Sequence, residues 1–224
     1  MLSFEDFSAR LVRGQLKNLS VANNSNLGEI SPDYVDTILS LTNQGLVDLS
    51  TRLVLVKKQI DLVFVTDQHT YPLVDGAAYL DSSDSQTDIF VQESFVKTLD
   101  VFDADGVRYS PNTEGHILTP TYNTLRFTSD VMEDLDPKVR IRYQAKYATI
   151  TETDNIELPP NLYTALQLFV ASLYISHMGG KDHSAKGDSY FAAYLRHIGE
   201  DVIRDTSSTS EVEEDTRLTD RGFV

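Results

Sequence analysis

Histidine and carboxylate side chains in the C-terminal third of the chain have the types that could hold a metal ion. His177, His183 and His197 occur near Asp182 and Asp188. No two of these histidines are four residues apart, which is the spacing that places two ligands on one face of a helix. The chain also contains no cysteine. We therefore expect no metal site, and we interpret these histidines as helix-end and hydrogen-bonded residues.

Three other motifs have the composition of a functional site but not its spacing. Gly179-Gly180-Lys181-Asp182 lacks the spacing of a P-loop and its following Ser or Thr, so it is interpreted as a turn between helices. Asp103-Ala104-Asp105-Gly106 begins like a calcium loop, but its glycine is fourth instead of sixth, which favours a hairpin turn. The carboxylates Glu133, Asp134 and Asp136 are clustered without a distinguishable general acid and base. The sequence therefore predicts no enzyme and no cofactor.

Charge is unevenly distributed along this chain of 224 residues, whose formal net charge is −15. Residues 61–137 contain fifteen acids and three bases, and residues 138–149, which follow directly, contain four bases and no acid. The overall negative charge argues against general affinity for nucleic acid or anionic membranes. We expect no signal peptide and no membrane-spanning helix. The composition predicts a soluble, acidic protein of the cytoplasm, or of an assembly formed there.

Apolar residues with helical spacing predict helices towards both ends of the chain. The four predicted helices span residues 4–18, 32–55, 161–177 and 185–204. Ser3 and Ser31-Pro32 are start signals for the first two. The third helix is apolar on almost every face, so it lies either at the centre of its own bundle or against another chain.

A two-residue period replaces the helical one in the middle of the chain. The predicted strands span residues 59–66, 69–74, 95–102, 107–110, 117–119, 124–128 and 139–147. We expect the first two to form a hairpin with each other. A polar excursion lies between Gly76 and Glu93, and the sequence assigns it no role.

This order of elements predicts an α+β protein. Its N- and C-terminal helices form a four-helix bundle, with an inserted antiparallel β-rich domain and an extended C-terminal tail. The predicted parts are residues 1–56 (N-terminal helices), 57–150 (β-rich domain), 151–204 (C-terminal helices) and 205–224 (acidic tail). The tail contains too few apolar residues to offset the entropy cost of ordering it alone.

The last strand carries the four bases that follow the acidic region. Apolar residues at odd positions from Val139 alternate with Lys138, Arg140, Arg142, Gln144 and Lys146. This basic face is interpreted either as a solvated strand face or as a surface that meets acids of a neighbouring copy. In the second interpretation Arg140, Arg142 and Lys146 lie at a subunit boundary. Their partners there would be acids of the adjacent copy, Asp130, Glu133, Asp134 or Asp136.

Several segments between residues 30 and 204 form a pattern of residue types and order. They are Leu41-Thr-Asn-Gln-Gly-Leu-Val-Asp-Leu-Ser-Thr-Arg-Leu53 followed by Lys57-Lys-Gln-Ile-Asp-Leu62, His69-Thr-Tyr-Pro-Leu73, Ile156-Glu-Leu-Pro-Pro-Asn-Leu-Tyr-Thr-Ala-Leu166 and Gly187-Asp-Ser-Tyr-Phe-Ala-Ala-Tyr-Leu195. In this pattern the chain resembles the head-to-tail adaptor family of tailed bacteriophages, also called connector or tail tubular protein A-like proteins. The excursion between Gly76 and Glu93 is longer than the resemblance leads us to expect.

The resemblance implies a non-enzymatic virion protein, assembled in the host cytoplasm and located in the neck between capsid and tail. Such a protein forms a homo-oligomeric, dodecameric ring under the portal protein, extends the DNA channel, and presents a platform for a tail or nozzle protein. DNA would pass without specific binding, because acidic walls repel phosphate. The resemblance also implies that the terminal segment docks on the portal. Leu218 and Phe223 would be its anchors, and Arg217 and Arg221 would pair with acids beside them.

Other functions remain open from the residues alone. They are a different phage tail or baseplate structural protein, a soluble α+β binding module, and a small-molecule enzyme with an unrecognised site.

Overall fold

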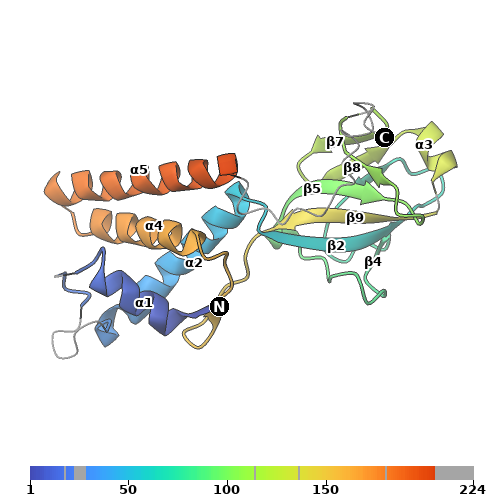
Figure 1. Cartoon of the computed structure of the whole chain (residues 1–224). Helices are drawn as coiled ribbons and strands as arrows, with labels where there is room; N and C mark the ends of the chain where they lie inside the picture. The colour runs from blue at the N-terminus through green and yellow to red at the C-terminus, as the bar shows by residue number, and fades with distance from the viewer. Residues whose placement is uncertain (18, 23–28, 114, 136, 180, 205–224) are drawn as a thin grey trace, which may run out of the picture. The chain divides into compact units, whose positions relative to one another are not determined.

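The computed structural model describes residues 1–17, 19–22, 29–113, 115–135, 137–179 and 181–204 of the chain. The chain divides into two compact units, whose α-helices and longer strands are labelled in Figure 1. The helical unit combines Met1–Tyr34 with Ile156–Val224, and the β unit is the continuous segment Val35–Asn155. The β unit is thus inserted, in chain order, between the two parts of the helical unit. Helices and antiparallel sheets are both present, which confirms the predicted α+β class.

Three helices make up most of the helical unit. They are α1 (Phe4–Arg13), α4 (Leu162–His177) and α5 (Lys181–Arg204). Ser3 caps α1 as predicted, since its Oγ accepts a hydrogen bond of 3.0 Å from the Asp6 N–H. A short strand, β1 (Leu2–Ser3), pairs with β10 (Asn155–Ile156), and the 3-10 helix η1 spans Pro32–Tyr34.

Helix α4 packs against both α1 and α5 (Figure 1). It is buried on most sides, including Leu166, Phe169, Val170 and Ile175. A helix with neighbours on several sides needs no polar face. The apolar composition of α4 is therefore explained within its own chain.

Helix α5 begins at Lys181, four residues before the predicted start, and contains Gly187 in its second turn. A Cβ atom at Gly187 would lie 2.2 Å from Ser176 Oγ and 3.0 Å from the Ser172 carbonyl oxygen, both on α4. The glycine therefore permits the close approach of α5 to α4, and it does not mark a helix boundary.

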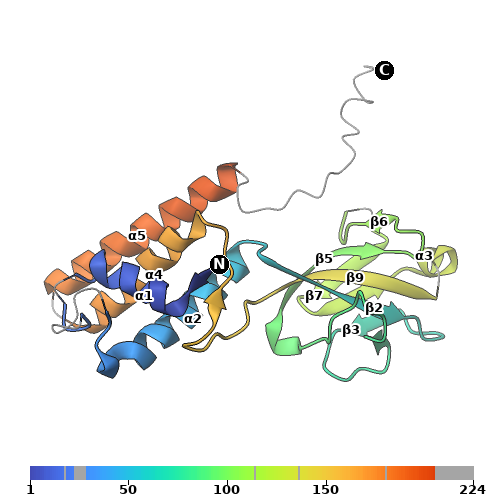
Figure 2. The same ribbon diagram turned by 60° about the horizontal axis from the view of Figure 1, so that its bottom comes forward.

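The β unit contains two antiparallel sheets, seen from a second direction in Figure 2. The five-stranded sheet has the order β4-β2-β9-β5-β6, and the three-stranded sheet has the order β3-β8-β7. The strands are β2 (Val56–Val63), β3 (Thr70–Pro72), β4 (Leu80–Asp81), β5 (Phe95–Phe102), β6 (Arg108–Tyr109), β7 (Ile117–Thr121), β8 (Thr124–Phe127) and β9 (Lys138–Ala145). The unit also contains α2 (Val35–Arg52), α3 (Ser129–Asp134) and the 3-10 helix η2 (Gln92–Ser94).

Both sheets contribute to one hydrophobic core. Strand β9 supplies Val139, Ile141, Tyr143 and Ala145, all fully buried, as its alternating pattern predicts. The other members of the core include Ile60, Leu62, Tyr71, Val101, Leu125 and Phe127. One face of β9 therefore packs in the core, and the opposite face carries the charged residues of the strand.

The predicted hairpin between residues 59–66 and 69–74 is wrong. Strand β2 pairs with β4 and β9, whereas β3 pairs with β8 in the other sheet. Asp67 has a positive φ of 61° and turns the chain away from β2. The Tyr71 hydroxyl then donates to the Gln68 carbonyl oxygen at 2.7 Å and accepts from the Val65 N–H at 3.0 Å, which holds the crossing between the sheets.

Helix α2 belongs to the β unit, whereas its sequence pattern predicts a helix of the terminal bundle. Hydrogen bonds of Asn43 connect α2 to the segment that follows β9. The Asn43 side chain donates to the Ile150 carbonyl oxygen at 3.1 Å and accepts from the Ile150 N–H at 2.9 Å. A four-helix bundle is not shown by the structure.

Candidate functional site

The basic side chains of β9 lie opposite acidic ones on both neighbouring strands. In the register, Arg140 is opposite Asp61 of β2, and Arg142 is opposite Asp100 of β5. Directly opposed residues of an antiparallel pair point to the same face of the sheet, so these charges can meet. The face is therefore an ordered arrangement of ion pairs, in which Arg142 is buried and Arg140 half-buried.

Arg140 contacts three different side chains. Its guanidinium donates to Asp61 at 2.7 Å, to Asp84 at 2.6 Å and to the Gln86 side-chain oxygen at 2.5 Å. Lys138 lies 2.8 Å from Asp61 and 3.1 Å from Asp81. The hydrogen bonds to Asp61 raise the pKa of both Arg140 and Lys138 above their ordinary values.

Arg142 forms the most buried pair of the network. Its Nε and Nη2 lie 3.0 Å and 2.7 Å from Asp100 Oδ2, and its guanidinium lies 5.0 Å from the centre of the Phe102 ring. Arg108 of β6 donates to the other oxygen of Asp100 at 2.7 Å. One buried carboxylate therefore joins β5, β6 and β9.

The excursion between Gly76 and Glu93 covers the outer edge of β2. Strand β4 pairs with β2, the Asp88 N–H donates to the Gln59 carbonyl oxygen, and Asp88 Oδ2 accepts from the Gln59 N–H. Asp81 and Asp84 come from the same segment, so it also neutralises the bases of β9. Covering an edge strand in this way prevents edge-to-edge pairing.

Asp81 gives this network a pH dependence. Hydrogen bonds from the Ser83 hydroxyl and N–H, and from Lys138, lower the pKa of Asp81 to about 2 from the ordinary 3.8. A folded-state pKa below the unfolded one stabilises the fold above the unfolded pKa, and this contribution disappears as the pH falls through the folded pKa. We expect the stability difference between the wild type and Asp81→Asn to be full at about pH 5 and to vanish towards about pH 2. Urea unfolding at several pH values measures this difference. A difference independent of pH would contradict it.

Gln144 closes the C-terminal end of α2. Its Nε2 donates to the carbonyl oxygens of Ser50 at 2.6 Å and Leu53 at 3.0 Å, and the side chain is almost completely buried. These are carbonyls that a helix end leaves without intrahelical partners. Gln144 is therefore a structural residue, although it lies on the predicted basic face.

We expect Gln144→Leu to lower the free energy of unfolding by about 1–2 kcal/mol, because buried carbonyl groups lose their donor. The measurement is chemical unfolding followed by circular dichroism. Gln59→Leu, on the opposing strand and half-buried, is the control and should cost less. Equal losses for the two variants would rule out the capping role.

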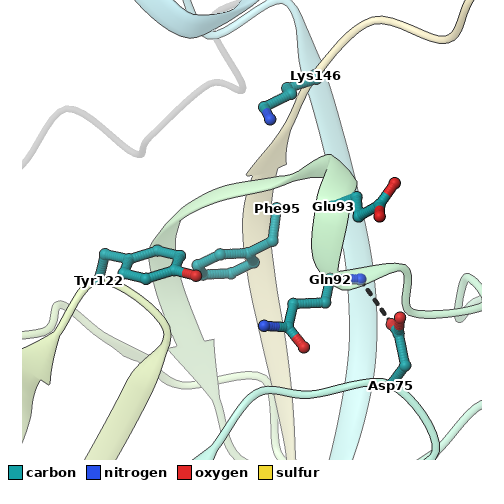
Figure 3. Close-up of a pocket in the computed structure, with 6 residues that line it drawn as sticks. All are labelled: Asp75, Gln92, Glu93, Phe95, Tyr122 and Lys146. Atoms are coloured by element: carbon teal, nitrogen blue, oxygen red, sulfur yellow. Dashed lines mark hydrogen bonds between the residues drawn. The ribbon is translucent and has the colours of Figure 1, made fainter.

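A pocket of about 390 Å³ lies in the β unit, beyond the C-terminal end of β9 (Figure 3). It is lined by Asp75, Gln92, Glu93, Phe95, Tyr122 and Lys146. The Phe95 and Tyr122 rings form one wall, with centroids 6.4 Å apart, and Asp75 Oδ1 accepts a hydrogen bond of 2.6 Å from the Gln92 N–H. The pocket therefore combines aromatic surface with both signs of charge.

Of these six residues, only Lys146 is among the interface residues predicted from the sequence. The others come from separate loops and strand ends, so no spacing along the chain relates them. Tyr122, in the turn between β7 and β8, is 64% exposed, and nothing in the sequence distinguished it from the other tyrosines.

Only some of the other predicted interface and docking residues lie in the part of the chain that the structure describes. Asp130 and Glu133 are exposed on α3. Asp134 is the last residue of α3. Asp136 and the predicted portal-docking residues Arg217, Leu218, Arg221 and Phe223 lie outside the described residues. Arg140 and Arg142 are engaged with acids of their own chain, and Lys146 forms no ion pair within the described part of the chain.

His197 and the predicted turn at Asp103–Gly106 have ordinary structural surroundings. His197 Nε2 lies 2.9 Å from the Asn161 carbonyl oxygen. Asp103 accepts from the Val107 N–H at 2.8 Å in the β5–β6 hairpin, where Gly106 has a positive φ of 84°. Over the described residues, no group of three or more His, Asp or Glu side chains could hold a metal ion. None of the helices in the described ranges has the length and hydropathy needed to cross a bilayer.

The chain matches no protein-family model, and no curated protein matches its sequence.

Proposed function

We propose that this protein is a structural subunit of a ring that joins the portal to the tail of a tailed bacteriophage and extends the DNA channel. The observation that carries the proposal is the order of the two units, in which β unit Val35–Asn155 interrupts the helical unit. The resembling segments are distributed over both units in the order that the adaptor family implies. The proposal assigns the protein no catalytic activity, no cofactor and no metal.

The proposed ring is homo-oligomeric and dodecameric, located in the neck of the virion and assembled in the host cytoplasm. Within each subunit, the helices of residues 1–56 and 151–204 would form the four-helix bundle. The ring would contact the portal protein on one side and a tail or nozzle protein on the other, without contact with a membrane.

The net charge of −15 supports a conduit for DNA. A wall lined with unpaired lysine and arginine would hold the duplex by releasing counterions, whereas an acidic wall repels phosphate. In the β unit, Lys138, Arg140, Arg142 and Arg108 are all paired with aspartates. These bases are therefore poorly placed to bind DNA. Weak binding is what a channel needs if DNA is to slide through it during ejection.

The acidic segment of residues 205–224 is proposed to dock on the portal. Leu218 and Phe223 would supply apolar anchors, and Arg217 and Arg221 would pair with acids beside them. In a ring, many weak contacts of this kind act together, so each can be individually weak.

The experiment is a native mass measurement and electron microscopy of the full chain, alone and mixed with portal protein. We expect rings with rotational symmetry that join the portal, and a chain truncated after Arg204 that stays folded but no longer joins. A full chain that remains monomeric with and without portal would overturn the proposal.

One observation favours a second candidate, a binding module such as another tail or baseplate protein. The pocket beside Lys146, at about 390 Å³, has the size of a ligand or side-chain site. A protein with this role would bind one partner without forming a closed ring, so the same mass measurement separates the two.

A further inference from the structure

The pocket of Figure 3 has more acidic than basic groups in its wall. Its lining contains the carboxylates of Asp75 and Glu93 and a single ammonium, that of Lys146. No ion pair joins Lys146 to either acid, and neither acid pairs with another base of the described residues. The wall therefore carries a net negative charge that the described part of the chain does not neutralise, and it favours a cationic occupant.

The acidic and basic groups of the wall are separated. In Figure 3, Lys146 lies above the Phe95 ring, whereas Asp75 lies below it. Asp75 Oδ1 accepts the Gln92 N–H at 2.6 Å, which holds this carboxylate at the wall. A carboxylate has acceptor positions on both oxygens, and Oδ2 of Asp75 has no partner among the described residues. A cation can therefore bind Asp75 at a distance from the Lys146 ammonium.

The aromatic wall favours one kind of cation. The Tyr122 ring is 64% exposed, and its centroid lies 6.4 Å from that of the buried Phe95 ring. The face of an exposed ring attracts a cation, and a planar guanidinium can stack on it while its N–H groups donate to carboxylates. An ammonium is compact and strongly hydrated, so it gains less from the ring. The pocket therefore matches a guanidinium better than an ammonium.

The side chains next to the pocket indicate a protein as the source of this group. Ile89 and Val91, in the segment leading to Gln92, are 77% and 43% exposed. Exposed aliphatic side chains beside a pocket are typical of a protein contact, in which a buried arginine is often a main anchor.

We propose that the pocket binds an arginine side chain of a partner protein. The guanidinium pairs with the carboxylates of Asp75 and Glu93 and stacks on Tyr122. Apolar neighbours of the arginine cover Ile89 and Val91. This contact goes beyond the proposed ring and does not depend on it.

The test is the binding of blocked tripeptides to the full chain, followed by nuclear magnetic resonance shifts of its backbone amides. The probes are acetylated and amidated Leu-Arg-Leu, Leu-Lys-Leu and Leu-Glu-Leu, which differ only in the central side chain. We expect Leu-Arg-Leu to shift the amides of Gln92 and Glu93 with a dissociation constant on the order of 1 mM, because one side chain makes few contacts. Leu-Lys-Leu should bind more weakly, and Leu-Glu-Leu should not bind.

Substitutions in the pocket test the sign of the occupant's charge. Asp75→Asn, which retains an acceptor for the backbone N–H, and Glu93→Gln should each weaken Leu-Arg-Leu binding about two- to fivefold, as for an exposed ion pair. Tyr122→Ser should weaken it by removing the stacking surface. Lys146→Met should tighten it, because it removes a like charge from the wall. Asp105→Asn, at an exposed acid of the β5–β6 turn outside the pocket, is the matched control and should bind like the wild type.

Several results would overturn the proposal. If D105N weakened binding as much as D75N, the peptide would respond only to the net charge of the chain. Tighter binding of Leu-Glu-Leu than of Leu-Arg-Leu, or weaker Leu-Arg-Leu binding by K146M, would assign the pocket to an anion. Equal binding of Leu-Lys-Leu and Leu-Arg-Leu would remove the guanidinium, and a Leu-Arg-Leu titration without saturating shifts would remove the site. Circular dichroism of each variant shows that weakened binding is not lost folding.

Discussion

Asp100→Ala is expected to lower the free energy of unfolding by about 3–5 kcal/mol, the typical cost of removing one partner from a buried ion pair. Asp100 and Arg142 have side chains only 5% and 10% exposed, with 2.7 Å between Asp100 Oδ2 and Arg142 Nη2. The variant leaves the charged guanidinium buried beside Phe102 without this carboxylate. It also removes an acceptor of Arg108, a residue of β6.

The control for this prediction removes both charges. The double variant D100L/R142M replaces the pair with apolar side chains, and such replacements are often neutral or stabilising. We therefore expect the double variant to be more stable than D100A alone. Urea unfolding of the full chain, followed by circular dichroism, compares the three proteins. If D100A unfolds at the same urea concentration as the wild type, the buried pair does not stabilise the β unit.

Strongly periodic elements could be predicted from the sequence. Strand β5 covers residues 95–102, the predicted range, and α4 differs from its predicted helix by one residue. Apolar alternation fixes which residues of a strand face the core, so Val139, Ile141 and Tyr143 were correctly placed. Elements of two residues, such as β1, β4 and β10, are too short to produce a period.

The partners of the charged face could not be predicted in the same way. Alternation places Arg140 and Arg142 on one face, but it does not say which residues other strands bring opposite them. Asp61 is 79 positions from Arg140, and Asp100 is 42 positions from Arg142. The pairs depend on the register of β9 with β2 and β5, which is a tertiary property.

The position of the excursion between Gly76 and Glu93 and the position of the pocket could not be predicted for the same reason: neither follows from a side-chain period. Asp81 and Asp84 lie in an irregular segment, whose position on the edge of β2 follows from backbone pairing and not from side-chain period. The pocket assembles Asp75, Tyr122 and Lys146 from three different connections. Only the excess of bases in residues 138–149 over the acidic surroundings pointed to this region, and it identified Lys146.

Replacing either of two glycines of α5 with alanine is expected to change the free energy of unfolding, in opposite directions at the two positions. At Gly187 a Cβ atom would meet Ser176 Oγ at 2.2 Å and the Ser172 carbonyl oxygen at 3.0 Å, whereas at Gly199 no atom lies within 4 Å. The hydroxyl of Ser176 can rotate, but the backbone carbonyl of Ser172 cannot move unless α4 and α5 separate. We expect Gly187→Ala to destabilise the protein by about 2–3 kcal/mol through overpacking.

Gly199→Ala tests the same helix without the steric contact. Alanine has a higher helix propensity than glycine, so this variant should gain up to about 1 kcal/mol. The two variants share the chemical change and the host helix, and their midpoints in urea should lie on opposite sides of the wild type. The rings that pack between α4 and α5, Phe169 and Tyr194, would report the separation through altered near-ultraviolet circular dichroism. If both variants were stabilised, the distance between α4 and α5 would not depend on Gly187, and helix propensity alone would govern this part of the helical unit.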